Sequence, residues 1–251
     1  MTNRTLDGKV ALVTGAAGEI GTATIQLLAE RGARIVAVDR DSEGLARAFG
    51  KLPASAEALS IVADVSHEQD VASYVTRARD AMGGVHIFFN NAGIVGDIKP
   101  IPDYPVETLR RVLDINVVGV FLGLKYVLPV MRSQGVGSIV NTASVAGLMG
   151  GPHFAAYSAS KHAVIGLTKS AALECAGSQV RVNCVCPGLI DSRMLSTIVN
   201  GMPVEKALER IPARRLGLAT DVAAVVAFLA SDDARYVTGA SYPVDGGRTA
   251  G

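Results

Sequence analysis

The sequence predicts an α/β protein built on an open, doubly wound, seven-stranded parallel sheet with helices on both faces. Short β-branched runs recur along the 251 residues, and most are almost continuously apolar, which is typical of strands buried on both faces of a parallel sheet. Between these runs apolar residues repeat with a helical period, so strand and helix alternate. In such a sheet, ligands bind beyond the carboxyl ends of the strands.

The expected strands follow one another at regular intervals. They are Val10–Val13, Arg34–Asp39, Leu59–Val65, Val85–Asn90, Ser138–Thr142, Val180–Val185 and Ser241–Val244. Apolar residues share one helical face at residues 20–28, 71–82 and 222–229, and residues 108–131 and 155–176 form the longest expected helices. No linker or internal repeat divides the chain, so residues 1–251 are predicted to be one domain. The least regular segment, at about 188–217, is expected to form a lid or substrate loop over the ligand site.

Composition and charge narrow the possible partners. With 24 Lys and Arg against 23 Asp and Glu, the net charge of +1 gives no reason to expect a nucleic acid or an anionic membrane. The amino terminus lacks the apolar core of a signal peptide, and apolar runs stop at charges such as Lys125 before the roughly 20 residues of a membrane span. The three cysteines have no metal-site spacing. We therefore expect a cytoplasmic protein without a metal site or membrane partner.

A glycine-rich turn follows the first strand directly. The segment from Thr14 to Gly21 reads TGAAGEIG and leads into the first amphipathic helix. Small residues let the backbone approach a diphosphate, which the helix N-terminus attracts through its free N–H groups. The residues expected at the diphosphate are Gly15, Gly18, Glu19, Ile20 and Gly21. Asp39 ends the second strand 18 residues after Gly21, close to the spacing of about 20 expected of the acid that binds the adenosine ribose of a dinucleotide.

Asp39 also bears on which nicotinamide cofactor binds. A carboxylate at the ribose accepts hydrogen bonds from both hydroxyls of NAD but repels the 2′-phosphate of NADP. Arg40, the next residue, could pair with that phosphate if Asp39 moved aside. The sequence therefore favours NAD.

A tyrosine and a lysine four residues apart open the later long helix. The i, i+4 spacing places Tyr157 and Lys161 on one helical face. A phenol with a pKa of about 10 needs a nearby cation to act as an acid or base near neutral pH, and Lys161 supplies one. Ser144 ends a buried strand 13 residues before Tyr157, where its hydroxyl could hold a substrate oxygen beside the phenol.

With these motifs the chain resembles the short-chain dehydrogenase/reductase family in its compact single-domain Rossmann form, over nearly its whole length. Further matching pieces are Asp64-Val65, Asn90-Asn91-Ala92-Gly93, Asn116 within DINV, Arg181-Val182-Asn183 before Pro187-Gly188, and Val244-Asp245-Gly246-Gly247. The resemblance implies a nicotinamide-dependent interconversion of an alcohol and a carbonyl compound. It implies that Tyr157 exchanges a proton with the substrate oxygen, that Ser144 orients this oxygen, and that Lys161 binds the nicotinamide ribose and lowers the pKa of Tyr157.

The resemblance assigns further site residues. Asn116 would hold a water that completes a proton relay, although an interior amide satisfied by backbone is the alternative. Asp64 and Val65 would frame the adenine, and Asn91, Ala92 and Gly93 would line the cofactor groove. The nicotinamide end would contact Pro187, Gly188, Ile190 and Ser192. Glu19 is an unusual acid for a phosphate turn, and we expect it to point to solvent.

The expected substrate crevice is mostly apolar. Its candidates are Ile94, Val95, Leu148, Met149, His153, Phe154, Leu189 and Met194, which favour a neutral secondary alcohol or ketone of medium size. Arg193, Arg214 and Arg215 leave room for an acidic substrate. Two alternatives stay open: an NADPH-dependent 3-oxoacyl-thioester reductase, against which Asp39 argues, and a non-catalytic dinucleotide sensor, against which Ser144, Tyr157 and Lys161 argue. The resemblance also implies a homotetramer assembled through the two long helices.

Overall fold

One seven-stranded sheet forms the centre of the protein in a computed structural model that describes residues 5–199 and 203–250. The strands lie in the order β3-β2-β1-β4-β5-β6-β7 and all neighbours are parallel. They span Val10–Thr14 (β1), Arg34–Asp39 (β2), Ala58–Val62 (β3), Ile87–Asn90 (β4), Gly137–Thr142 (β5), Val180–Pro187 (β6) and Ser241–Val244 (β7). The predicted fold class is confirmed, and the strand bounds agree with prediction to within two residues except at β3.

The predicted third strand was too long, because β3 ends at Val62 rather than Val65. Its last ladder partner is Asp39, the end of β2, and β2 is its sole neighbour in this sheet. Beyond that point the Asp64 carboxylate accepts hydrogen bonds from the backbone N–H and the hydroxyl of Ser66, at 2.9 and 2.6 Å. This local turn takes the chain out of the sheet.

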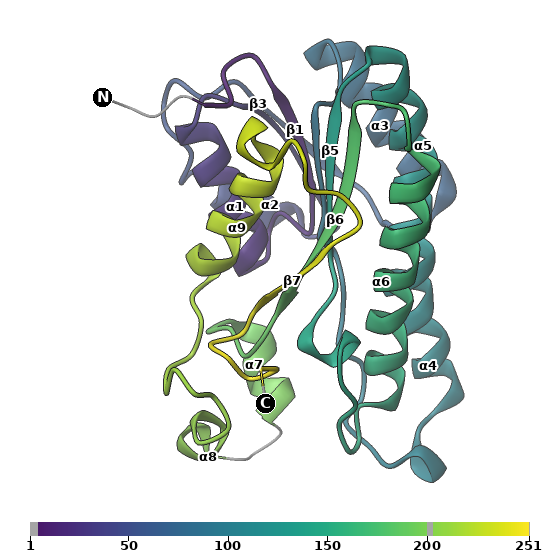
Figure 1. The fold of residues 1–251 in the computed structure, drawn as a ribbon, viewed down its shortest axis with the longest axis vertical. Helices are drawn as coiled ribbons and strands as arrows, with labels where there is room; N and C mark the ends of the chain where they lie inside the picture. Colours follow the sequence, from purple (N-terminus) through teal and green to yellow (C-terminus); the bar gives the residue numbers. More distant parts are fainter. Residues whose placement is uncertain (1–4, 200–202, 251) are drawn as a thin grey trace.

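Helices cover both faces of the sheet (Figure 1). The helices α1 (Glu19–Glu30), α2 (Ser42–Phe49) and α9 (Ala219–Ala230) pack on one face. The opposite face is covered by α3 (Glu68–Met82), α5 (Gly119–Gln134) and α6 (Ala155–Glu174). Alternate strand residues serve the two cores: Leu12 joins the cluster beneath α3, α5 and α6, and Val13 joins the other. The central strand β1 is therefore apolar on both faces, as its sequence predicts.

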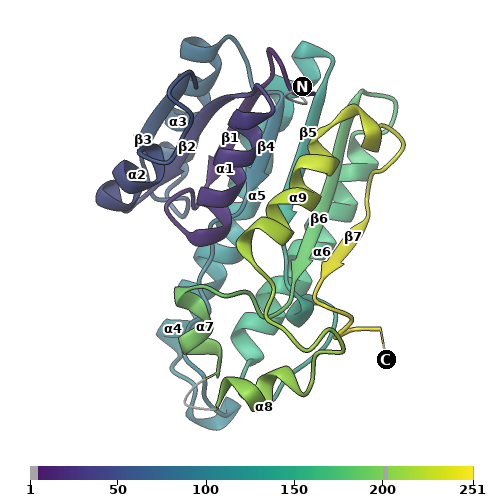
Figure 2. The same cartoon turned by 90° about the vertical axis from the view of Figure 1, so that its left-hand side faces the viewer.

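Shorter helices complete the described chain. They are η1 (Ile101–Asp103), α4 (Val106–Leu113), η3 (Val145–Gly147), α7 (Arg193–Val199), α8 (Val204–Leu208) and η4 (Asp232–Ala234). Figure 2 shows α7 and α8 beyond the carboxyl ends of the strands. Both belong to the segment 188–217 that the sequence marks as a lid, of which residues 200–202 lie outside the described residues.

The helices α4 and α5 are joined by a wider turn, η2 (Asp114–Val118), in which the Gly119 N–H donates to the Asp114 carbonyl five residues earlier. Together they form one continuous helix, Val106–Gln134, which is long and apolar enough to cross a membrane by length and composition alone. Its apolar window is 56% buried inside the protein, as expected of a helix packed on a sheet. The expectation that the chain has no membrane partner stays a prediction.

Candidate active site

A cleft of about 650 Å³ opens at the carboxyl end of the sheet, where the strand order reverses between β1 and β4. All residues that the sequence predicts to bind the cofactor line this cleft, and so does Ser144. They are Gly15, Gly18, Glu19, Ile20, Gly21, Asp39, Arg40, Asp64, Val65, Asn91, Ala92, Gly93, Tyr157, Lys161, Pro187, Gly188, Ile190 and Ser192. Residues drawn from the whole length of the chain thus converge on one site.

The glycine turn is fitted closely to the start of α1. A Cβ at Gly21 would collide with the carbonyl oxygen of Gly15, so only glycine lets the helix begin this close to the turn. The neighbouring strand end is fixed by Thr14, whose hydroxyl accepts hydrogen bonds from the N–H groups of Asn91 and Ala92 at 2.9 and 3.2 Å. The turn thus forms a narrow backbone cradle at a helix N-terminus, which fits the diphosphate of a dinucleotide.

The Asp39 carboxylate is held rigidly at the end of β2. One oxygen accepts the N–H of Ala17 and the other the N–H of Asp41, both at 3.0 Å. Each carboxylate oxygen keeps a further lone pair for another donor. The carboxylate can therefore accept two ribose hydroxyls while it stays in place.

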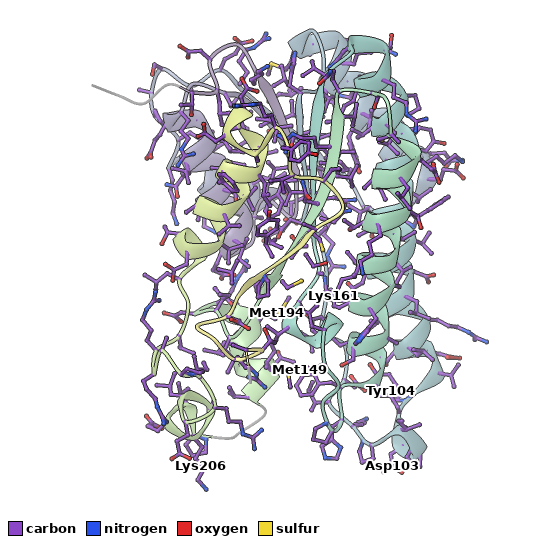
Figure 3. The ribbon with its side chains drawn as sticks, viewed as in Figure 1. Asp103, Tyr104, Met149, Lys161, Met194 and Lys206 are labelled. Atoms are coloured by element: carbon purple, nitrogen blue, oxygen red, sulfur yellow. The ribbon has the colours of Figure 1, made fainter. Side chains whose placement is uncertain are left out.

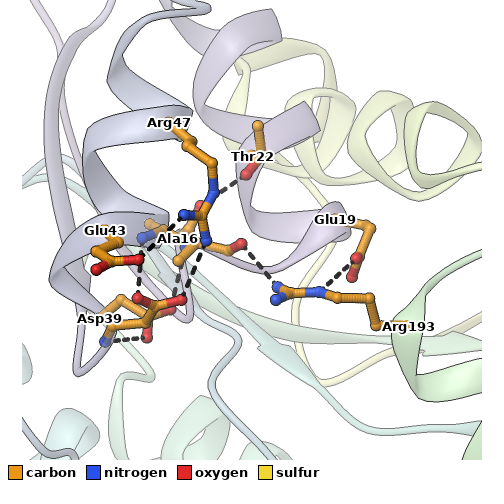
Figure 4. A network of polar contacts seen from close by, with 10 residues as sticks. Ala16, Glu19, Thr22, Asp39, Glu43, Arg47 and Arg193 are labelled. Carbon is orange, nitrogen blue, oxygen red and sulfur yellow. Dashed lines mark hydrogen bonds and ion pairs between the residues drawn. The ribbon is translucent and has the colours of Figure 1, made fainter.

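Glu19 does not point to solvent, contrary to expectation. Its carboxylate forms an ion pair with Arg193, the first residue of α7, at 2.8 Å, and the same guanidinium donates to the Ala17 carbonyl at 3.1 Å (Figure 4). Partial burial opposes ionisation of Glu19, but its backbone hydrogen bond and Arg193 outweigh this effect and lower its pKa. The negative charge that would weaken diphosphate binding is thus paired with a cation from the lid segment.

Tyr157, Ser144 and Lys161 lie together deeper in the cleft. The Ser144 hydroxyl hydrogen-bonds to the Tyr157 phenol. The Lys161 amine donates to the Thr142 carbonyl at 2.8 Å and lies 5.7 Å from the centroid of the Tyr157 ring. Figure 3 shows Lys161 above Met149 and Met194, at the carboxyl end of the sheet. The structure therefore brings together the serine, tyrosine and lysine that the sequence assigns to catalysis.

Burial dominates the electrostatics of this group. It raises the pKa of Tyr157 above 10, although the hydrogen bond from Ser144 acts in the opposite direction. It lowers the pKa of Lys161 to about 8. Lys161 therefore remains mostly protonated at pH 7. The effect of Lys161 on the Tyr157 pKa stays a prediction; its amine is buried and lies 5.7 Å from the centroid of the Tyr157 ring.

Asn116 lies in the wide turn η2, behind the wall of the cleft. Its side-chain oxygen accepts the N–H of Ile94 at 2.8 Å, and its amide nitrogen donates to the Ile94 carbonyl at 2.8 Å and to the Ser160 hydroxyl at 3.0 Å. The side chain therefore fixes the loop after β4, which agrees with the interior-amide alternative. The water relay stays a prediction.

A second cavity of about 140 Å³ adjoins the first, and Ser144, Tyr157, Gly188 and Ile198 line both. Of the expected substrate residues, Met149, Phe154 and Leu189 line this cavity, whereas Ile94, Val95 and Met194 line the larger cleft. Neither set of lining residues includes Leu148 or His153. The catalytic hydroxyls thus lie where a dinucleotide-sized cleft meets a small, mainly apolar pocket.

The arginines named from the sequence do not enter the small cavity. Arg193 binds Glu19, Arg214 donates to the Glu209 carbonyl at 3.1 Å, and Arg215 pairs with Asp221 at 2.7 Å. Two other arginines, Arg210 and Arg248, line the cavity instead. No sequence pattern singled them out, because each lies in a turn whose path is set by tertiary packing.

Thr14 and Thr142 were also missed as site residues. Thr14 joins the ends of β1 and β4, and the Thr142 carbonyl holds the Lys161 amine. Both residues end buried strands, and this position was the available signal. A polar residue at the carboxyl end of an apolar strand is a natural candidate for such a role.

Comparison with known proteins gives matches over almost the entire chain. The profile of a family described as enoyl-(acyl carrier protein) reductase matches residues 15–249. Levodione reductase of Leifsonia aquatica is 42% identical over 96% of this chain and 94% of its own length, and a levodione reductase crystal structure superposes with a TM-score of 0.95. Cyclohexanol dehydrogenase of Acinetobacter sp. (strain SE19) is 40% identical, with 99% and 98% of the two chains covered. The crystal structure of an NAD+-bound xylitol dehydrogenase superposes with a TM-score of 0.92 at 39% identity, covering 96% of this chain and 99% of the other.

Proposed function

The chain belongs to the short-chain dehydrogenase/reductase family, and from this membership we propose that it is an NAD-dependent oxidoreductase that interconverts a secondary alcohol and a ketone. The observation that carries the proposal is the position of Tyr157 and Ser144, whose side chains lie where the dinucleotide-sized cleft meets the small pocket. A substrate in that pocket would present its oxygen to both hydroxyls. The intact catalytic group argues against a dinucleotide sensor that has lost its chemistry.

Each residue then has a defined task in alcohol oxidation. When bound, NAD+ supplies the acceptor for the hydride that leaves the alcohol carbon. Tyr157, in its ionised form, takes the proton of the alcohol hydroxyl, and Ser144 donates a hydrogen bond to the same oxygen. Lys161 contributes a positive charge beside the phenol and has further N–H donors for the nicotinamide ribose. In reduction, the Tyr157 phenol returns the proton.

Burial alone makes the Tyr157 phenolate unfavourable, so additional positive charge has to stabilise it. Lys161 is one source, and the oxidised nicotinamide ring is the second. We therefore expect the pKa of Tyr157 to be lower in the NAD+ complex than in the free protein. This expectation accounts for a catalytic base that forms when the cofactor is present.

The preference for NAD over NADP is supported by the Asp39 carboxylate, which places a negative charge at the ribose end of the cleft. Arg40 is exposed and lines the same end, so it is the available partner for a 2′-phosphate. In an NADPH-dependent thioester reductase, Arg40 would have to bind the 2′-phosphate despite the repulsion between that phosphate and Asp39.

The test is a screen of secondary alcohols with NAD+ that follows the absorbance of the reduced cofactor. Tyr157→Phe should abolish turnover and leave the Kd for NAD+ within about twofold, because it removes the proton acceptor and keeps the ring. Retained turnover in Tyr157→Phe would contradict the mechanism. A parallel measurement of NADH and NADPH affinities separates this function from the thioester reductase, which would bind NADPH more tightly.

We also propose a cytoplasmic homotetramer. Apolar side chains on the long helices support self-association, since Phe121 on α5 and Leu173 on α6 are 51% and 77% exposed. The three cysteines are buried and unbridged, which suits a reducing compartment. Light scattering on the purified protein tests the assembly, and a monomeric mass would contradict it.

A further inference from the structure

The small cavity beside Tyr157 contains an unexpected pair of cations. Most of its wall is apolar, and it includes Met149, Phe154, Leu189 and Ile198. Arg210, just after α8, and Arg248, in the turn after β7, line the same space. An apolar pocket usually contains few polar groups, and those it has determine which ligand group it accepts.

These two guanidinium groups differ from the other arginines near the lid. No described carboxylate lies within the 4.0 Å ion-pair distance of Arg210 or Arg248, and neither guanidinium makes a side-chain hydrogen bond within residues 5–199 and 203–250. The nearby Asp245 carboxylate is occupied by the Gly247 and Thr249 N–H groups, at 2.9 Å each, and by the Thr249 hydroxyl at 2.7 Å.

The backbone holds the two arginines on connected segments. The Ala213 N–H donates to the Gly246 carbonyl at 3.0 Å, which ties the end of the lid to the turn after β7. Ile211 is 2% exposed and packs with Leu189, Leu195 and Ala207 in a small core within the lid segment. Burial and the charge of Arg210 lower the pKa of Arg248, and the charge of Asp245 opposes them only in part. Bringing two cations together costs free energy unless an anion joins them.

Resting on the proposed function, we propose that the physiological substrate is a secondary alcohol or ketone that carries a carboxylate, which Arg210 and Arg248 bind in the small cavity that Tyr157 also lines. A planar guanidinium matches a carboxylate with two parallel hydrogen bonds. The apolar residues of the cavity wall suit a short aliphatic chain or ring that separates the carboxylate from the reacting oxygen. The cavity volume of about 140 Å³ restricts this spacer to a small one.

The experiment compares a hydroxycyclohexanecarboxylate with its uncharged carboxamide, which has nearly the same shape. The wild-type enzyme with NAD+ should prefer the carboxylate by at least tenfold in kcat/KM. Arg248→Gln and Arg210→Gln should each lower kcat/KM for the carboxylate by about 10- to 100-fold, the range of one lost charge-assisted hydrogen-bonded pair, chiefly through KM. Turnover of the carboxamide should change less than threefold. Arg77→Gln, at an exposed position on α3, is the matched control and should leave both substrates unaffected.

A binding measurement keeps the test independent of turnover. Calorimetric titration of the NAD+ complex with cyclohexanecarboxylate and with cyclohexanecarboxamide should give tighter binding of the carboxylate, and the difference should disappear in the double variant Arg210→Gln/Arg248→Gln. Equal binding of the two compounds, or a preference that survives the double variant, would overturn the carboxylate site. Failure of the proposed function is distinct: no alcohol of either kind would then reduce NAD+, whatever the arginine variants bind.

Discussion

Asp39→Ala is the most informative change for the cofactor, because Asp39 bears on both NAD and NADP in opposite directions. In the structure its two oxygens are fixed by the N–H groups of Ala17 and Asp41, so the carboxylate cannot turn away from a ligand without breaking these bonds. The substitution removes the acceptor for the ribose hydroxyls of NAD. It also removes the charge that repels a 2′-phosphate.

The expected size follows from these two effects. A hydrogen bond to a charged acceptor contributes about 1.5–3 kcal/mol, so the Kd for NAD+ should rise by about 10- to 100-fold. A carboxylate and a phosphate charge about 4 Å apart repel each other by roughly 1–4 kcal/mol, depending on local screening. Removal of Asp39 should therefore lower the Kd for NADP+ by about tenfold or more, because the exposed Arg40 is then available to bind the 2′-phosphate. The ratio of the two Kd values should change by at least about 100-fold.

Isothermal titration of each protein with NAD+ and NADP+ measures this ratio directly. Asp39→Asn is the matched control, since it keeps the shape and removes the charge, and it should recover most of the NADP+ gain with a smaller loss of NAD+ affinity. If the ratio in Asp39→Ala equals that of the wild type, Asp39 does not contact the adenosine ribose. The assignment of the ribose end of the cleft would then be wrong.

Three further predictions concern the other contacts in the site. Arg193→Ala should weaken NAD+ binding by about fivefold, because an unpaired Glu19 charge near the diphosphate costs roughly 1 kcal/mol. Adding Glu19→Gln should restore the affinity, as measured by titration. A double variant that binds NAD+ as weakly as the single variant would contradict this. Gly93→Ala should lower kcat by about tenfold with an unchanged circular dichroism spectrum, because the added Cβ would lie 3.1 Å from Asn116 Oδ1 and 3.3 Å from Lys161 Nζ; an unaltered kcat would refute it. Between pH 8 and 10.5, the free energy of unfolding of the wild type should rise by up to about 3 kcal/mol relative to that of Lys161→Met. The reason is that the unfolded chain binds the Lys161 proton more tightly than the folded protein does. Denaturant titrations of the two proteins that show the same pH dependence would disprove this.

The fold was predictable because local pattern and tertiary environment agree. The run at Val10–Thr14 is apolar on both faces because both faces of the sheet are covered by helices. The cofactor end of the site was predictable for a related reason. Its residues follow strands at fixed short distances, and parallel strands bring their carboxyl ends to the same edge. Asp39 could be assigned to the ribose because it is the last residue of β2.

The other contacts of the site join segments that lie far apart in the sequence, so no local pattern predicts them. Glu19 and Arg193 are 174 residues apart, and the path of the lid alone decides that they meet. Arg210 and Arg248 converge through the contact of Ala213 with Gly246. The burial that raises the pKa of Tyr157 likewise depends on tertiary packing, whereas the sequence identifies only its neighbour Lys161.

The short helix α7 has a consequence for how the two ligands influence each other. Arg193 and Met194 line the larger cavity, Val199 lines the smaller one, and Ile198 lines both, so this helix separates the two cavities. A dinucleotide that fixes the position of α7 also fixes one wall of the smaller cavity. If the dinucleotide changes the affinity for the second ligand by some factor, the second ligand must change the affinity for the dinucleotide by the same factor. The second ligand does so by slowing dissociation of the dinucleotide or by speeding its binding. Retention of the cofactor therefore depends on the concentration of substrate.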